Sequence, residues 1–544
     1  MEMFSPENQN KKYDHLFTEI DTGYIKIPKF QREFVWTKRQ TAKLIDSIIK
    51  GFPVGTFIFW KTREELRHIK NIGNAKLPTQ TLGESVAYVL DGQQRITSLF
   101  AVKKGLIITK EGKEIDYKDI SVDLSLNPND EDEVIIPEPS EEIPSISVYQ
   151  LLNGTIMEFL DEFTRDEIRK IEIYQRRLTT YDFSTIVINE YPIDIACEIF
   201  TRINTGGMEL TLFEIMVAKT FDQDTGFDLA SEYDMLIDDN HGGKDLKDAG
   251  YDTIPSSIIL QCIAACLIQD VKRKSILKLE KSKVINIWSE VKDSIFHATD
   301  YFRSHYRIPV SRLLPYPALL VLFTYFFYKN NGNPPDSTQN KLLMQYYWWV
   351  SLSRRFSSAS ETKIAQDLKR IDEILKGRII SYDEEEQVRL TLNGIINRQF
   401  STGDSFCKAI LSLYAYYLPK SFSDNSLVRI DNSWLKVAFS KNYHHFFPKS
   451  YLTKNGFNDH EANSIVNITI VDDYLNKRAI GAKAPSDYMN DFNSTNEHLD
   501  KTMRTHLIDD IDKYGIWTDD YNLFLKNRGK KILRLLERRL NPKF

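Results

Sequence analysis

A long helical stretch in the middle of the chain constrains the fold most. From about residue 211 to residue 430, apolar residues recur at the spacing of amphipathic helices, and few runs alternate as strands do. The clearest helices are expected over residues 254–270, 318–328, 342–353 and 407–418. Segments with both strand-like and helical patterns lie before and after this stretch. The pattern therefore predicts an α+β protein with a helical middle.

The length of the chain predicts more than one hydrophobic core. With 544 residues, the chain is expected to form about two to four domains. We divide it into an α+β domain over residues 1–215, a mostly helical linker domain over residues 216–430, and a smaller mixed domain over residues 431–544. Hydrophobic residues make up 42% of the chain, which is ample for these cores.

Composition excludes several classes of protein. The net charge of −5 argues against a uniformly basic surface, although a local basic patch is enough to bind a phosphate backbone. Four scattered cysteines do not fit a disulfide framework. The N-terminus lacks the apolar core of a signal peptide, and the longest apolar run, residues 318–328, is about half the length needed to cross a bilayer. We expect a cytoplasmic protein without a membrane partner.

A strand, a tight turn and a helix are predicted in succession near residue 90. Residues 85–90 read as a buried strand, Asp91-Gly92-Gln93-Gln94-Arg95 as the turn, and residues 96–102 as helix. The N–H groups at a helix start attract anions, and a glycine lets the backbone approach a phosphate. Arg95 can add a bidentate contact. The same residues fit a tight turn with surface glutamines equally well.

Two adjacent histidines, His444 and His445, lie in an aromatic stretch near the C-terminus. Residues 437–439 and 444–447 are expected to form one arm of a β-hairpin, residues 464–471 the other, and a helix with Asn476 to follow. Successive strand residues point to opposite faces, which suits one imidazole as a metal ligand and the other as a base aimed at water. Taken alone, the pair fits surface or packing residues better.

Cleavage of a phosphodiester is one chemistry that such a constellation can perform. The reaction needs a deprotonated water, and stabilisation of charge on the phosphate and on the leaving oxygen. A histidine titrates near neutral pH and can act as the general base. One divalent metal can stabilise the charge. Asn467 in the second arm and Asn476 after it complete a candidate site of this kind.

Motifs at both ends of the chain resemble one family. His444-His445-Phe446-Phe447-Pro448-Lys449-Ser450, residues 465–470 and residues 476–485 resemble the HNH (ββα-metal) nuclease domain at the C-terminus of GmrSD-type proteins. Residues 27–36, 91–99 and 200–207 are similar to the N-terminal domain of the same family. That domain resembles the ParB/sulfiredoxin-like fold and is associated with nucleotide binding and hydrolysis. The resemblance covers the chain apart from its helical middle.

The resemblance implies roles for residues of the C-terminal domain. His445 matches the general base, and Asn467 matches the residue that orients the active-site loop. His444 and Asn476 match the metal ligands, and Lys449 and Lys483 are assigned to DNA binding. His444 stands where many HNH domains have Asp. Imidazole binds Mg²⁺ less readily than a carboxylate does and suits softer metals, so the expected cofactor is Mg²⁺ or Mn²⁺, with Ni²⁺ as a further candidate.

In the N-terminal domain the resemblance implies a site for a nucleoside triphosphate, GTP or ATP. Its predicted residues are Gln31, Arg32, Asp91, Gly92, Gln93, Gln94, Arg95, Arg202 and Asn204. Arg202 and Asn204 lie at the end of a predicted helix, where a following glycine pair is first of all a helix cap.

The implied function is that of an NTP-regulated, modification-dependent (type IV) restriction endonuclease. Its expected partner is double-stranded, modified phage DNA in a bacterium or archaeon. The alternative is an NTP-dependent DNA-binding regulator, or an NTPase switch, with a weak or degenerate nuclease domain. The oligomeric state stays open, a homo-oligomer included.

Two further segments can be interpreted without a catalytic role. Residues 127–147 are acidic and contain prolines, which predicts a solvated loop. Residues 526–544 combine an apolar stripe with many basic residues. They fit a terminal helix that packs on the protein and exposes its basic residues to solvent, and equally a helix whose basic residues contact the DNA backbone.

Overall fold

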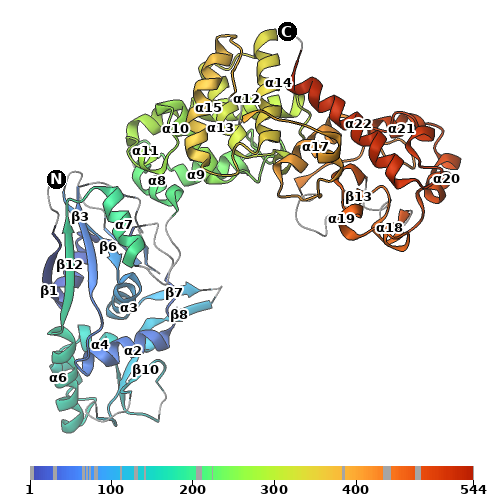
Figure 1. The fold of residues 1–544 in the computed structure, drawn as a ribbon. Coiled ribbons are helices and arrows are strands. Elements are labelled where there is room, and N and C mark those ends of the chain that lie inside the picture. The colour runs from blue at the N-terminus through green and yellow to red at the C-terminus, as the bar shows by residue number, and fades with distance from the viewer. Residues whose placement is uncertain are drawn as a thin grey trace. The chain divides into compact units, whose positions relative to one another are not determined.

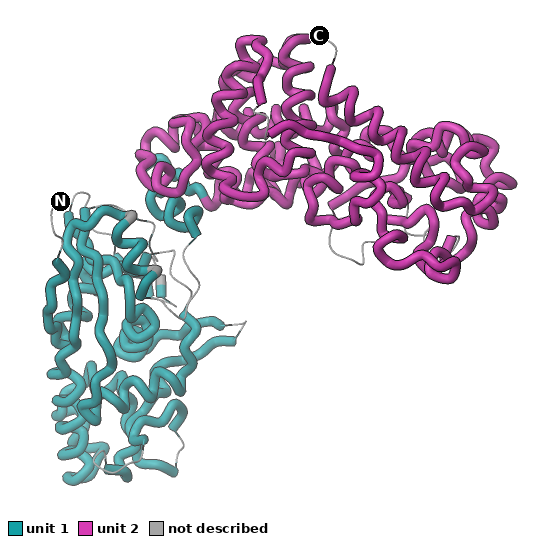
Figure 2. Tube along the Cα trace, in the orientation of Figure 1, with its two compact units in different colours: residues 1–229 teal, residues 230–544 magenta. Residues whose placement is uncertain are grey.

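The structure is a computed structural model whose described residues form two compact units, residues 1–229 and residues 230–544 (Figure 2). The described residues are 5–28, 34–63, 66, 68, 71–72, 75–78, 84–110, 113–127, 133–139, 142–203, 211–222, 224–382, 386–432, 443–471 and 480–542. Each unit is treated below by itself. The domain boundaries expected near residues 215 and 430 stay predictions.

A mixed sheet forms the centre of the first unit (Figure 1). Its strands, in spatial order, are β1 (Glu7–Lys12), β12 (Asp182–Asn189), β3 (Phe57–Thr62), β6 (Val86–Asp91) and β2 (Ile25–Lys26). β12 pairs with β3, and β2 with β6, in parallel, whereas β1–β12 and β3–β6 are antiparallel. Every residue of β6 up to Leu90 is buried, as expected of a central strand.

The helices of the first unit build one core with this sheet. They are α1 (Tyr13–Asp21), α2 (Lys38–Ile49), α3 (Gln93–Lys104), α4 (Val148–Asn153), α5 (Ile156–Phe159), α6 (Arg165–Thr179), α7 (Ile193–Ile203) and α8 (Leu212–Thr220), with the 3₁₀ turn η1 (Tyr117–Asp119). Phe57 and Phe59 of β3 lie in this core with Phe17 of α1 and Phe100 of α3. Thr37 caps the start of α2 with a complete capping box to Gln40.

Part of the segment predicted as a solvated loop belongs to a second, smaller sheet. β9 (Ser121–Asp123) lies between β10 (Ile135–Ile136) and β11 (Ser145–Ser147). The loop prediction for residues 127–147 was therefore wrong over these strands. The reason is that Ile135 and Ile146 bury their side chains in the same core as Val122. Two hairpins complete the unit, β4 (Asn71–Ile72) with β5 (Ala75–Lys76) and β7 (Ile107–Lys110) with β8 (Lys113–Asp116).

The second unit begins with packed helices, as the sequence predicts. They are α9 (Leu229–Ile237, whose first residue belongs to the first unit), α10 (Ser256–Ile268), α11 (Arg273–Ile276), α12 (Lys281–Ser304), α13 (Ala318–Lys329), α14 (Ser337–Ser353), α15 (Ser360–Leu375), α16 (Leu392–Ile396) and α17 (Ser405–Tyr416), with the 3₁₀ turn η2 (Ser311–Leu313). Almost all of α13 is buried, because α10, α12 and α15 pack around it.

A short hairpin and further helices complete the second unit. They are β13 (Tyr443–His445), α18 (Lys449–Lys454), α19 (Asp459–Ala462), η5 (Ile465–Asn467), β14 (Ile468–Ile470), α20 (Pro485–Thr495), α21 (Leu499–Thr505), η7 (Ile511–Tyr514) and α22 (Tyr521–Leu540). α22 packs on α14 and α16, so the C-terminal segment shares a core with the helical segment before it.

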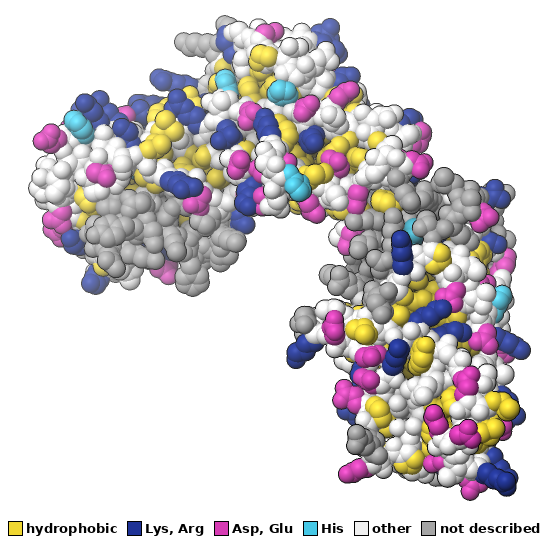
Figure 3. Space-filling model, turned by 180° about the vertical axis from the view of Figure 1, so that it is seen from behind, with side chains coloured by type: hydrophobic (Ala, Val, Ile, Leu, Met, Phe, Trp, Pro, Cys, Tyr) yellow, Lys and Arg dark blue, Asp and Glu magenta, His cyan; other side chains and the backbone are white. Residues whose placement is uncertain are grey.

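The described residues thus form a mixed α/β protein with a helical C-terminal region. The ParB/sulfiredoxin-like and HNH folds expected for its parts stay predictions. Within the described ranges, no helix has both the length and the apolar surface that crossing a bilayer requires. On the face shown in Figure 3, basic and acidic side chains are interspersed over both units, in keeping with the small net charge.

Candidate functional site

The two histidines lie on a short antiparallel hairpin, as predicted. His444 of β13 pairs with Thr469 of β14, and His445 pairs with Ile468. The second arm is shorter than the predicted residues 464–471, because residues 465–467 form the 3₁₀ turn η5 instead of a strand. Ser464 caps this turn by accepting a hydrogen bond from the Val466 N–H. The predicted contribution of residues 437–439 to the first arm lies outside the described residues.

Asn467 fixes the loop that follows the histidines. Its side chain is fully buried, and its Oδ1 accepts a hydrogen bond from the Phe447 N–H at 2.8 Å. Its Nδ2 donates to the carbonyl oxygens of Phe447 and Ala462, at 3.0 Å each. The Asn467 carbonyl also accepts from the Phe446 N–H at 2.8 Å. This arrangement orients the backbone immediately after His445.

His445 is oriented by Asn463, a residue that the sequence analysis missed. Asn463 Nδ2 donates to the Phe400 carbonyl at 3.2 Å, so its Oδ1 faces His445 Nε2 at 3.1 Å. Nε2 must then carry the proton, which leaves Nδ1 as the accepting atom of the neutral ring. Burial, which outweighs the bond to Asn463, lowers the pKa of His445 to about 4, and the nearby Lys449 lowers it further. At neutral pH the ring is therefore uncharged and can accept a proton.

His444 has a different environment from its neighbour. Its side chain is 3% exposed, and its ring lies edge-on to Tyr488 of α20 at 6.4 Å between ring centroids. Among the described residues no three His, Cys, Asp or Glu side chains are grouped as a metal site requires. Asn476, the other predicted ligand, lies outside the described residues. His444 is thus the one predicted ligand whose surroundings can be stated.

Arg528 of α22 is a second residue whose importance the sequence did not reveal. In the sequence it is one of the many cations of the basic C-terminal segment, but the structure buries its side chain completely. The guanidinium donates to the carbonyls of Val466 at 2.6 Å and Ile468 at 2.7 Å, and to that of His506 at 3.1 Å. The Val466 and Ile468 carbonyls flank Asn467 in the chain, so Arg528 supports the segment that carries Asn467.

The two lysines assigned to DNA binding differ in their surroundings. Lys449 is the first residue of α18, is partly exposed, and lies close enough to His445 to lower its pKa. Lys483 instead forms an exposed ion pair with Asp491 at 2.8 Å. Lys449 therefore has the more direct connection to the candidate site.

In the first unit, the predicted strand, turn and helix are confirmed around Asp91-Gly92-Gln93-Gln94-Arg95. Gly92 ends β6 and caps α3 with a φ of 90°, a left-handed conformation that favours glycine. A side chain there would collide with Phe57, whose Cδ1 lies 2.2 Å from the position of a Cβ. Gln93 and Gln94 are buried, so the interpretation of this motif as a turn with surface glutamines was wrong in that respect.

The side chains of this motif connect three segments of the first unit. Gln94 Oε1 accepts hydrogen bonds from the N–H groups of Val35 at 2.9 Å and Trp36 at 3.4 Å. Arg95 donates to the carbonyls of Val54 at 2.6 Å and Thr56 at 3.0 Å, and pairs with Asp91 at 3.0 Å. Its guanidinium also lies over the Phe57 ring. The motif therefore has a positioning role inside the fold.

Of the other predicted nucleotide-binding residues, Arg202 is described, and it does not join this geometry. Arg202 lies on the exposed side of α7, paired with Glu198 at 2.6 Å. Gln31, Arg32 and Asn204 lie outside the described residues. The described residue nearest in sequence to Gln31 and Arg32 is Phe34, whose ring packs against the Lys110 ammonium group at 3.9 Å.

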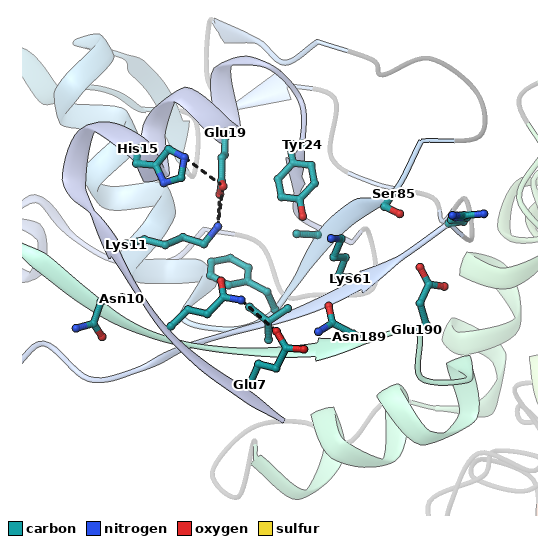
Figure 4. A pocket seen from close by; sticks show the side chains of 15 residues that line it. Glu7, Asn10, Lys11, His15, Glu19, Tyr24, Lys61, Ser85, Asn189 and Glu190 are labelled. Carbon is teal, nitrogen blue, oxygen red and sulfur yellow. Dashed lines mark hydrogen bonds and ion pairs between the residues drawn. The ribbon is translucent and has the colours of Figure 1, made fainter. Parts of the chain in front are cut away.

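A polar pocket of about 570 Å³ lies on the first unit, at the other end of β6 from Asp91 (Figure 4). Lys11 and Glu19 form an ion pair at 2.5 Å on one side of it. Lys61, Asn189 and Glu190 line it on the other, as Figure 4 shows. Of the residues predicted to bind the nucleotide, those that the structure describes do not line this pocket.

Comparison with known proteins identifies similarity in the first unit and along most of the chain. Residues 13–221 match the sequence model of the family described as "GmrSD restriction endonuclease, N-terminal domain". The uncharacterized protein MJ0686 of Methanocaldococcus jannaschii is 24% identical over 508 residues, which cover 86% of this chain and 84% of that protein. The first match supports a GmrSD-like protein, and it lies wholly within the first unit.

Proposed function

We propose that this chain is a modification-dependent DNA endonuclease of the restriction type, with its cutting site at His445 and Asn467. The observation that carries the proposal is the match of residues 13–221 to the N-terminal domain of a restriction endonuclease family. The hairpin geometry supports it. His445, whose Nδ1 is the accepting atom of the ring, precedes a loop that the buried Asn467 holds from both sides, an arrangement suited to aiming a base at water.

In the proposed reaction, His445 Nδ1 takes a proton from the attacking water. Asn463 keeps the ring in the tautomer that leaves Nδ1 available, and the low pKa of His445 keeps the ring neutral before the reaction. Lys449, whose charge acts on His445, is placed to bind a phosphate of the DNA.

A divalent metal is part of the proposal, with His444 and Asn476 as its ligands. When bound, the metal stabilises negative charge on the phosphodiester that is being cut. The His444 side chain is buried, which supports a role as a ligand better than a role as a solvated surface residue. Because one ligand is an imidazole, Mn²⁺ and Ni²⁺ are candidates beside Mg²⁺.

We further propose that the first unit binds GTP or ATP and regulates cleavage. The observation in support is the anion-binding layout of the Asp91-to-Arg95 motif, with a left-handed glycine at the start of α3. Since Arg95 holds backbone carbonyls at 54 and 56, its proposed part is to keep the turn in shape for the nucleotide.

The experiment that tests the function is a cleavage assay on a panel of differently modified phage DNAs. Each DNA is incubated with the full-length protein, with Mg²⁺, Mn²⁺ or Ni²⁺, and with or without each NTP. Cleavage of a modified DNA that depends on metal and responds to NTP is the expected result. Cleavage of none of the substrates under any of these conditions contradicts the proposal.

A second candidate function is an NTP-dependent DNA-binding regulator with a degenerate nuclease domain. It is favoured by His444, which stands in place of the carboxylate that many nucleases of this type have. Calorimetric titration with Mn²⁺ separates the two functions. Binding that disappears in Asn476→Ala favours the nuclease, and a wild-type protein that binds no divalent metal favours the regulator.

A further inference from the structure

One face of α22 carries a row of cations that the proposed site does not use. Lys526, Lys530, Arg534 and Arg538 are all exposed and follow one another at intervals of four residues. Successive residues at this spacing are neighbours on the helix surface, each turned by about 40° from the one before, so the four side chains form one row inclined to the helix axis, which we call the α22 basic stripe. Within the described residues, none of the four forms an ion pair or a side-chain hydrogen bond.

The acidic residues next to the stripe leave its charge largely uncompensated. Asp509 pairs with Lys531 and Asp510 pairs with Lys513, in both cases at 2.7 Å, so these carboxylates have partners outside the stripe. Glu537 is the acidic residue of the exposed face of α22 itself. Four positive charges therefore stand against one negative charge on this face.

The stripe does not serve the stability of the helix. Like charges at i,i+4 repel each other, so each of the three successive pairs in the stripe destabilises the helix. The helix dipole favours cations in the last turn, which accounts for Arg538 but not for Lys526 near the start. A ligand that supplies regularly spaced negative charge gives the stripe a function.

We propose that the α22 basic stripe binds the phosphate backbone of duplex DNA. From Lys526 to Arg538 the helix rises by about 18 Å, which matches roughly five steps of one DNA strand at about 3.4 Å each. The inference deepens the proposed function, because it rests on DNA being the substrate of the His445 site.

The opposite face of α22 connects the stripe to the candidate site. Arg528 donates to the carbonyls on both sides of Asn467. Phe524 stacks on Phe446 with 4.8 Å between ring centroids. A DNA strand held on the exposed face is therefore attached to a helix whose buried face supports the histidine hairpin.

Salt-dependent DNA binding by the full-length protein tests the inference. A fluorescent duplex of unmodified DNA is titrated in EDTA, so that nothing is cut, between 50 and 200 mM salt. The test variant replaces Lys526, Lys530, Arg534 and Arg538 by Gln. Because log K falls with log salt by about 0.9 per phosphate contacted, the slope is expected to become shallower by about 3 to 4.

A matched control removes the same charge elsewhere on the second unit. Lys272, Arg273, Lys274 and Lys278, around α11, are exposed and are replaced by Gln together. The control is expected to bind with the wild-type slope. Arg534→Lys with Arg538→Lys keeps the charge and is expected to keep the slope, whereas Glu537→Gln is expected to tighten binding. Circular dichroism verifies that each variant is folded.

Three results overturn the inference: a wild-type slope in the stripe variant, an equal loss in the control, or a stripe that binds anionic lipid vesicles but not duplex DNA. Failure of the proposed function is distinguishable from these. If the protein binds duplex DNA through the stripe but cuts no DNA in the cleavage assay, the nuclease proposal is contradicted and the proposal for the stripe is supported.

Discussion

The side chain of Asn467 holds the backbone of Phe447 at both of its polar groups. Oδ1 accepts from the Phe447 N–H at 2.8 Å, and Nδ2 donates to the Phe447 carbonyl at 3.0 Å. This pairing of a side chain with both backbone groups of one residue fixes the loop two residues beyond His445. Both groups are buried, so they have no access to water if the carboxamide is removed.

Asn467→Ala is therefore expected to destabilise the second unit by about 3–5 kcal/mol, since each buried polar group left unpaired costs about 1–3 kcal/mol. Urea unfolding measures the effect. Asn455→Ala is the control, because Asn455 is an exposed residue whose side chain bonds a carbonyl at the end of α18. Equal stability losses in the two variants contradict the structural role of Asn467.

Gly92→Ala tests the turn of the Asp91-to-Arg95 motif. The alanine has to adopt a φ of 90°, and its Cβ has to displace the Phe57 ring. Gly51→Ala is the matched control, because Gly51 has a φ of 73° and nothing within 4 Å of the added Cβ. Backbone strain of about 1–2 kcal/mol is common to both variants, so the additional loss in Gly92→Ala reports the collision. Thermal unfolding that shifts equally in both contradicts the geometry.

A buried histidine makes stability depend on pH. His506 Nε2 lies 2.7 Å from the Lys420 carbonyl and Nδ1 lies 2.7 Å from Thr469 Oγ1, so the ring is neutral, donating through Nε2 and accepting through Nδ1. Burial lowers the pKa of His506 to about 3, and Arg528, whose charge also acts on it, lowers it further. The unfolded chain therefore binds one more proton than the folded chain between about pH 6.5 and pH 3.

The direction of the pH dependence follows from this difference in the number of bound protons. His506 makes its full contribution to the free energy of unfolding above about pH 6.5. This contribution is lost as pH falls toward the folded-state pKa, at about 1.4 kcal/mol per pH unit. Urea unfolding at pH 6 and pH 5 is compared between wild type and His506→Gln, which lacks the titrating ring. The difference in unfolding free energy is expected to change by about that amount over this interval. A difference that does not vary with pH contradicts the assignment.

Local patterns allowed several elements to be predicted from the sequence. The strand and turn before α3 and the pairing of the histidine strand with a later strand are of this kind. Turn residues, capping side chains and apolar periodicity are local signals, and the structure agrees with them.

What could not be predicted depends on partners distant in the chain. Arg528 reads as one of many cations in a basic tail, but carbonyls at residues 466, 468 and 506 make its burial tolerable. The sequence suggests a phosphate ligand at Arg95, but its guanidinium donates hydrogen bonds to the carbonyls of residues 54 and 56. No sequence pattern pointed to Asn463, because its role depends on the hydrogen bond between its side chain and His445.

The rate of DNA cleavage by His445→Ala tests the central claim most directly. The control is His460→Ala, which removes an exposed imidazole on the neighbouring α19. On the modified DNA that wild type cuts, with the same metal and NTP, the account predicts a loss of about 10²–10⁴-fold in His445→Ala and a wild-type rate in the control. A His445→Ala protein that cuts as fast as wild type contradicts it.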